Sequence, residues 1–162
     1  SDLRHRADEV IDTSDHTVHT LKSLIQEHFS EEESPALQIT VLSFGFKHGV
    51  PVESDLVFDV RFLPNPYFVS DLRDMSGSAD EVADYVLGFS ETSQFLSLFQ
   101  QMAEFVLPMY EREGKSYLTI SIGCTGGQHR SVAVADTIAE RLAARGWDVS
   151  ARHRDVDVSD GD

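Results

Sequence analysis

One stretch of the sequence decides the fold: YLTISIGCTGGQHRSVAVADTIAERLAARGWDVSARH, residues 117–153. Its first residues, 117–123, are mostly apolar or β-branched, which predicts a buried strand. After a glycine-rich loop, residues 130–145 predict a helix that ends at Gly146, a residue typical of the position after a helix. Residues 147–153 predict a further strand. A strand, a helix and a strand in succession favour parallel pairing, so the stretch predicts an α/β fold.

The residues before this stretch extend the pattern. Apolar runs predict strands at residues 37–44 and 56–62. The sequence Ser78-Ala79-Asp80-Glu81 has the form of a capping box that opens a short helix, and Ser90 is a candidate cap for a longer helix through Tyr110. The elements together predict an α/β fold with a mostly parallel sheet of about four strands flanked by helices, in a single main domain.

This main domain is expected to cover residues 37–154. Upstream, residues 7–14 predict a short strand and the following residues a helix through His28. The charged, proline-containing residues 31–36 predict a linker. Downstream, the acidic residues 155–162 predict a disordered tail.

Composition excludes some classes of protein. The formal net charge is -15, from 28 Asp and Glu against 13 Lys and Arg, so any nucleic-acid binding requires a local basic patch. The single cysteine, Cys124, cannot form an internal disulfide, which fits a reducing compartment such as the cytoplasm. No apolar run approaches the roughly 20 residues of a membrane span. No Cys or His cluster has zinc-ligand spacing, so no metal is expected.

The loop between the strand at 117–123 and the helix at 130–145 has the composition of an anion cradle. Ligands of parallel sheets bind beyond the carboxyl ends of the strands, where this loop is expected to lie. Gly126 and Gly127 allow backbone amides to turn inward, and the helix beginning near Arg130 directs unpaired N–H groups at the same point. The Arg130 guanidinium can add two hydrogen bonds. The predicted phosphate-binding residues are Cys124, Thr125, Gly126, Gly127, Gln128, His129, Arg130 and Ser131. The structural alternative is a glycine-rich turn whose arginine pairs with a surface carboxylate.

Two other segments that follow strands are expected at the same edge of the sheet. Lys47 and Arg61 could balance the charge of a phosphomonoester, although surface ion pairs explain each of them equally well. His48, Asp59 and Asn65 could recognise hydroxyl or amino groups of the attached molecule.

The loop also permits a catalytic interpretation. Cys124, five intervening residues and then Arg130-Ser131 have the spacing of the protein-tyrosine-phosphatase loop, in which a thiolate attacks phosphorus. However, Gly123 stands where those phosphatases carry a histidine, no segment matches their acid loop, and the nearest candidate acid is Asp59.

The basic triplet Arg152-His153-Arg154 ends the last predicted strand. It could contact a second phosphate or an RNA backbone, and a solvated strand end explains it equally well.

Three long motifs in this order carry a family resemblance: SFGFKHG (43–49), FDVRFLPNP (58–66) and GCTGGQHRS (123–131), followed by SARHR (150–154). The sequence resembles the RapZ/YvcJ family of bacterial nucleotide-binding proteins. The resemblance implies an N-terminal P-loop kinase-like domain with ATP or GTP hydrolysis, of which residues 1–30 are only the end, and no cofactor in the present residues. It also implies a homo-oligomer.

The resemblance further implies a C-terminal domain that senses glucosamine-6-phosphate and binds a small regulatory RNA. Together with the predicted cradle, it favours a regulatory binding module. Such a module would recognise an amino-sugar phosphate through residues 124–131 and relay occupancy to an RNA or protein partner. An RNA-binding adaptor domain is the alternative, and a cysteine phosphatase is the third hypothesis.

Overall fold

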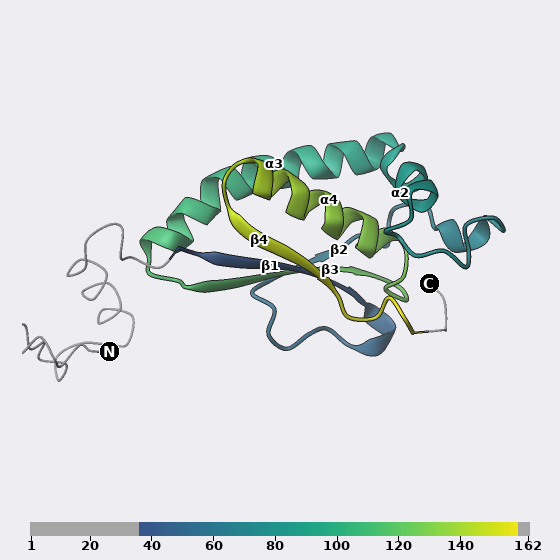
Figure 1. The fold of residues 1–162 in the computed structure, drawn as a ribbon, viewed down its shortest axis with the longest axis horizontal. Helices are drawn as coiled ribbons and strands as arrows, with labels where there is room; N and C mark the ends of the chain where they lie inside the picture. Colours follow the sequence, from purple (N-terminus) through teal and green to yellow (C-terminus); the bar gives the residue numbers. More distant parts are fainter. Residues whose placement is uncertain (1–35, 159–162) are drawn as a thin grey trace, which may run out of the picture.

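The structure, a computed structural model, describes residues 36–158 (Figure 1). The predicted strand at 7–14, helix through His28 and most of the linker at 31–36 lie outside these residues. The elements are β1 (Gln38–Gly45), the 3-10 turn η5 (Phe46–His48), β2 (Leu56–Asp59), the 3-10 turn η6 (Pro66–Phe68), α2 (Asp80–Leu87), α3 (Ser90–Arg112), β3 (Tyr117–Cys124), α4 (Arg130–Ala144) and β4 (Asp148–His153).

The four strands form one parallel sheet in the order β2-β3-β1-β4. The central strands β1 and β3 pair along their whole length, with Gln38 opposite Tyr117 and Gly45 opposite Cys124. The predicted α/β class with a mostly parallel four-stranded sheet is confirmed.

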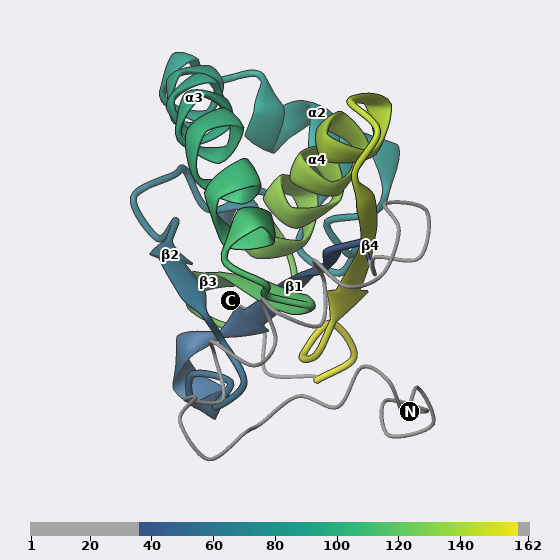
Figure 2. The ribbon, with the colours of Figure 1, turned by 90° about the vertical axis from the view of Figure 1, so that its left-hand side faces the viewer.

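The three helices cover one face of the sheet (Figures 1 and 2). Strand residues such as Val41 and Ile120 bury their side chains under these helices, at no more than 1% exposure. Helix α4 packs against β1, β3 and β4, and small residues, among them Ala133 and Ala135, are buried along it. The core therefore lies between the sheet and a single helical layer.

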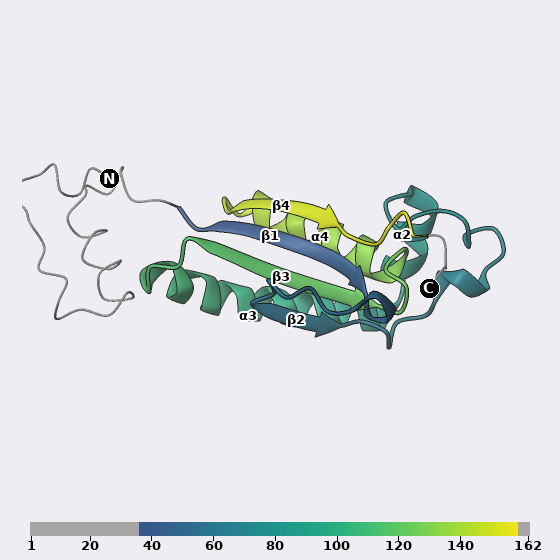
Figure 3. The same cartoon turned by 90° about the horizontal axis from the view of Figure 1, so that it is seen from below.

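The opposite face of the sheet is crossed by residues 46–55, which connect β1 to β2 without a helix (Figure 3). The Ser54 hydroxyl lies 2.6 Å from that of Ser121 on β3. The Phe46 ring packs edge-on against Phe44, with 4.8 Å between ring centroids. These contacts fix the connection against the strands.

Four predicted boundaries were wrong. Ser90 does not cap the long helix, because it is the first residue of α3 and the N-cap is Phe89. Helix α2 begins at Asp80 with Ala79 as N-cap, and the Ser78 hydroxyl donates to Asp136 at 2.9 Å instead of capping the helix. Strand β2 ends at Asp59 and not at residue 62, because Val60 donates a last bond to the Gly123 carbonyl and the chain then turns. The expected tail does not begin at Asp155, which is only 5% exposed.

Candidate functional site

The predicted loop lies at the topological switch point of the sheet, where the connections from two neighbouring strands leave in opposite directions. Strands β1 and β3 are neighbours and end side by side at Gly45 and Cys124. From β1 the chain passes across the open face of the sheet, and from β3 it enters α4 on the helical face (Figure 3). In open parallel sheets this divergence leaves a crevice at the carboxyl edge, which is where ligands bind.

The backbone of the loop touches the end of β1. Gly127 has a φ of 86°, a conformation that favours glycine. A Cβ atom at Gly127 would lie 2.6 Å from the Gly45 amide nitrogen, and one at Gly45 would lie 2.3 Å from the Gly126 carbonyl carbon. The two strand ends can meet only because these positions lack side chains. The loop then leads directly into the N-terminus of α4 at Arg130, which places backbone N–H groups at the crevice.

Three polar loop residues face inward. Cys124, His129 and Ser131 each have an exposed fraction of 0%. The Cys124 Sγ atom lies 3.1 Å from the Ser131 Oγ atom. The His129 Nε2 atom lies 2.9 Å from the Arg73 carbonyl oxygen, which ties the loop to the segment before α2. These side chains form the inner wall of the site, whereas Thr125 and Gln128 are partly exposed.

Arg130 is buried, with 3% exposure. One of its terminal nitrogens, Nη1, donates to the carbonyl oxygens of Arg61 at 2.8 Å and Leu63 at 3.0 Å. The other, Nη2, donates to the Thr125 hydroxyl at 3.3 Å. Arg130 thus fastens the turn after β2 to the loop after β3 and leaves a positive charge beneath both.

Arg61 and Asp59 form an exposed pair at the end of β2. The Arg61 Nε and Nη2 atoms donate to the two carboxylate oxygens of Asp59 at 2.9 and 2.6 Å. These hydrogen bonds lower the pKa of Asp59 below its ordinary value and outweigh the opposing effect of burial. The Arg61 guanidinium lies 4.0 Å from the centroid of the Phe46 ring, so it borders the turn after β1.

The remaining predicted residues lie on the two 3-10 turns. Lys47 and His48 belong to η5 and are exposed. The Lys47 amide donates to the Thr125 carbonyl at 3.2 Å, which brings η5 onto the loop. Asn65 caps η6 by accepting a hydrogen bond from the Tyr67 amide at 3.0 Å. Lys47, His48 and Arg61 therefore surround the outer side of the loop, and Asn65 has a local structural role.

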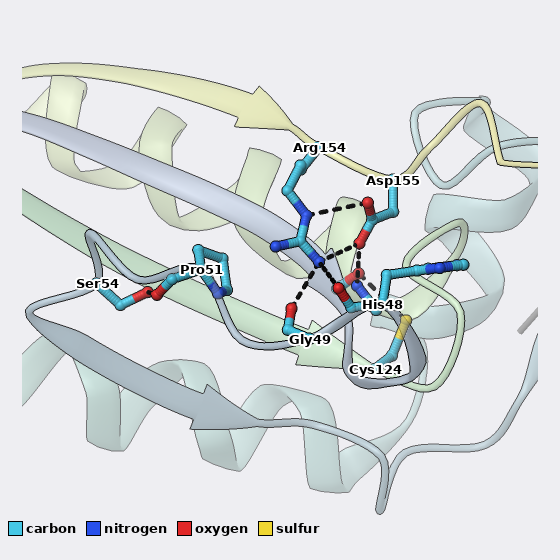
Figure 4. Close-up of polar contacts among 9 residues, drawn as sticks. His48, Gly49, Pro51, Ser54, Cys124, Arg154 and Asp155 are labelled. Atoms are coloured by element: carbon cyan, nitrogen blue, oxygen red, sulfur yellow. Dashed lines mark hydrogen bonds and ion pairs between the residues drawn. The ribbon is translucent and has the colours of Figure 1, made fainter.

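Sequence reasoning missed one part of the site, the Arg154–Asp155 clamp (Figure 4). The Asp155 carboxylate accepts the Gly45 amide at 2.8 Å and two bonds from Arg154 at 3.0 and 2.8 Å. Arg154 also donates to the carbonyl oxygens of His48 at 3.2 Å and Gly49 at 2.6 Å. Burial alone would raise the pKa of Asp155, but the bonds from Arg154 and Gly45 hold it below its ordinary value. The clamp fixes the backbone that carries Lys47 and His48.

A family model described as the RapZ C-terminal domain matches residues 37–157. The chain belongs to this family.

Curated relatives of this RapZ-type domain are named nucleotide-binding proteins. One from Clostridium botulinum strain Hall is 49% identical over 157 residues, which cover 96% of the chain and 53% of the relative. One from Clostridium novyi strain NT is 48% identical over 158 residues, covering 96% and 54%. One from Clostridium botulinum strain Eklund 17B is 50% identical over 157 residues, covering 96% and 53%. The chain spans about half the length of these relatives.

The basic triplet of the RapZ-type domain is divided among three roles. Arg152 is exposed on β4, the strand at one margin of the sheet. The His153 ring lies between two polar partners, with Nδ1 2.7 Å from the Ser43 hydroxyl and Nε2 2.8 Å from the Asp136 carboxylate. Arg154 belongs to the clamp. The structure therefore does not present the three side chains as one basic surface.

Within residues 36–158, the RapZ-type domain has no helix with the length and apolar character needed to cross a membrane. The same part of the chain contains no group of three or more His, Cys, Asp and Glu side chains placed to hold a metal ion.

Proposed function

We propose that this domain is a regulatory binding module that recognises a phosphorylated small molecule, an amino-sugar phosphate such as glucosamine-6-phosphate. The phosphate would occupy the crevice beside residues 124–131. The module would act within a larger cytoplasmic RapZ-like protein and relay ligand occupancy to a small regulatory RNA or a protein partner. The nucleotide binding for which the relatives are named would reside in a P-loop kinase-like domain.

One observation carries the proposal: positive charge gathers at one point of a strongly acidic chain. Arg130, which is buried, opens α4, and the exposed Lys47 and Arg61 lie on turns that the Lys47–Thr125 and Arg130–Arg61 hydrogen bonds join to this loop. The protein as a whole has a formal charge of -15, so this concentration is opposite to its average. A helix N-terminus next to two glycines supplies the N–H donors that a phosphate dianion requires.

The neighbouring polar groups suit the sugar part of such a ligand. The Asp59 carboxylate is ionised at neutral pH, as its lowered pKa reinforces, so it can accept a hydrogen bond from an ammonium or hydroxyl group. Thr125 and Gln128 of the loop are partly exposed and offer both donors and acceptors. Selectivity for an amino-sugar phosphate over inorganic phosphate would come from these contacts.

The geometry disfavours a cysteine phosphatase. The Cys124 side chain is fully buried, so its sulfur is not exposed to a phosphomonoester. Asp59, the candidate acid, is paired with Arg61 and has a lowered pKa, which makes it a poor proton donor at neutral pH. Turnover of a phosphomonoester that disappears in Cys124→Ser would contradict this assignment.

Calorimetric titration tests the binding proposal. Glucosamine-6-phosphate, glucosamine and inorganic phosphate are titrated separately into the chain, and we expect the sugar phosphate to bind most tightly. The variant Lys47→Ala should weaken its affinity about tenfold, or about 1.4 kcal/mol, because an exposed cation at the crevice is removed. Lys115→Ala is the matched control, since Lys115 precedes β3, at the end opposite the crevice, and pairs with Asp55 at 3.0 Å. Equal affinity of the wild type and Lys47→Ala, or no binding of any ligand, would contradict the proposal.

RNA binding without a small ligand remains the competing function. In that case Arg152, which is exposed on β4, and the cations around the crevice would contact the RNA phosphates. This reading predicts a steep loss of affinity with rising salt and a reduced salt slope in Arg152→Ala. The sugar-phosphate reading predicts that Arg152→Ala leaves the calorimetric titration unchanged.

A further inference from the structure

A shallow groove lies between the turn after β2 and the first turns of α3. The residues that line it are Phe62, Glu91, Gln94, Phe95 and Leu98. Phe62 and Leu98 are each 58% exposed, and Phe95 is partly buried at the margin of the core. Large apolar side chains that stay open to solvent around one hollow mark an interaction surface.

The aromatic wall of the groove is fixed by the fold. The ring centroid of Phe62 lies 6.1 Å from that of Phe95. The backbone on either side of Phe62 is held as well, because the buried Arg130 donates to the carbonyl oxygens of Arg61 at 2.8 Å and of Leu63 at 3.0 Å. The groove therefore exists before any partner arrives, which lowers the entropic cost of binding.

The helices beside the groove carry charge of one sign. Residues 74–111 include all of α2 and all of α3 except its last residue, and they contain no Lys, Arg or His. Every acidic residue of this stretch is exposed: Asp74, Asp80, Glu81, Asp84, Glu91, Glu104 and Glu111. Arg61, the cation next to Phe62, is already paired with Asp59 at 2.6 Å. The surface that surrounds the apolar groove is therefore negative.

We propose that this groove binds a cationic, amphipathic helical segment of a partner protein. Apolar side chains on one face of such a segment would pack against Phe62, Phe95 and Leu98, which is the helix-in-groove mode of recognition. Its Lys and Arg side chains would lie against Glu91 and the acidic surface of the two helices.

Charge complementarity decides the class of the partner. Nucleic acids and anionic lipid surfaces are repelled by the acidic residues that flank the groove, and a second copy of the same surface would bring like charges together. A cationic segment is attracted by them, which raises its rate of association and gives the binding its specificity.

Fluorescence anisotropy on the 162-residue chain tests the groove. The probe is a labelled peptide of leucine and lysine with all leucines on one helical face, about 15 residues long so that it can form a helix. We expect saturable binding, at least about tenfold weaker binding of a scrambled peptide of the same composition, and none when glutamate replaces lysine. Equal affinity for the scrambled peptide would mean attraction by charge without the groove and overturns the proposal. So does a lack of binding at low ionic strength. These titrations contain no sugar phosphate, so they do not depend on the function proposed for the loop.

Two matched pairs of variants locate the bound peptide. Phe62→Ser should raise the peptide Kd about tenfold, whereas Phe68→Ser should not, because Phe68 is 76% exposed but lies on η6, outside the groove. Glu91→Gln should raise the Kd and reduce its salt dependence. Glu111→Gln removes the same charge about 30 Å further along α3, at 1.5 Å per residue, and should do neither.

All four side chains are exposed or lie at the surface, so circular dichroism and the melting midpoint should show a retained fold. A Kd that Phe62→Ser and Glu91→Gln both leave unchanged overturns the proposal. Sedimentation equilibrium covers the remaining occupant: a dimer of the chain that Phe62→Ser dissociates would assign the groove to a second copy and would also overturn it.

Discussion

Replacing Asp155 by alanine measures what the Arg154–Asp155 clamp contributes to the fold. The carboxylate accepts the buried Gly45 amide at 2.8 Å, and this charge-assisted bond contributes about 1.5–3 kcal/mol. Its ion pair with Arg154 adds less than about 1 kcal/mol, because the Arg154 side chain is 32% exposed and therefore partly screened. The free energy of unfolding should fall by about 2–4 kcal/mol, which corresponds to roughly 10 °C in the melting midpoint of a domain of this size.

Urea denaturation followed by circular dichroism checks this value. Asp155→Asn is the intermediate variant. Its amide oxygen still accepts the Gly45 N–H but the charge is lost, so the free energy of unfolding should fall by about half as much as in Asp155→Ala. Asp157→Ala is the control, since Asp157 is exposed two residues further along. If Asp155→Ala unfolds within about 0.5 kcal/mol of the wild type, the residue is not fixed to β1 as described.

Three further predictions follow. The pKa of Asp155 is lowered in the folded state. Its contribution to stability is therefore complete above the ordinary carboxyl pKa and is lost as the pH falls through the pKa of the folded state. The unfolding free energies of Asp155→Asn and the wild type, measured as the pH is lowered, should therefore converge. Gly127→Ala should lower the melting midpoint far more than Gly146→Ala: both glycines have positive φ, at 86° and 95°, but only the Gly127 Cβ atom would collide with backbone. Comparable shifts would mean that the loop can relax. Asp59→Asn should leave the melting midpoint unchanged, because the Asp59–Arg61 pair is about half exposed, with side chains at 47% and 46%; a clear drop would refute this.

Local pattern was sufficient to predict the sheet. Residues 117–131 combine a β-branched run, a glycine pair and a helix start, and these features do not depend on distant residues. The carboxyl-edge rule then predicted that the loops after β1 and β2 would approach the loop after β3. The observed bonds from Lys47 to Thr125 and from Arg130 to Arg61 join those loops.

What sequence reasoning missed depends on partners far along the chain. Asp155 opens an acidic run and therefore resembles a tail, but its partner is the Gly45 amide, 110 residues away. Ser78 fits a capping box, in which its hydroxyl would accept a backbone N–H, yet this hydroxyl lies against Asp136 of α4 and donates to it. Arg130 was expected to present its donors to a ligand, and the carbonyls of Arg61 and Leu63 occupy one of its nitrogens. Short-range signals cannot reveal such competition between acceptors.

Amide chemical-shift mapping tests the central claim most directly. Glucosamine-6-phosphate is titrated into the ¹⁵N-labelled chain, and the backbone N–H signals are followed by nuclear magnetic resonance. If the phosphate binds at the N-terminus of α4, the largest shifts will fall on residues 125–131 and 45–48, and inorganic phosphate will move a subset of the same signals. Shifts confined to β4 or α3, or no shifts at millimolar ligand, would contradict the assignment of the loop as the binding site.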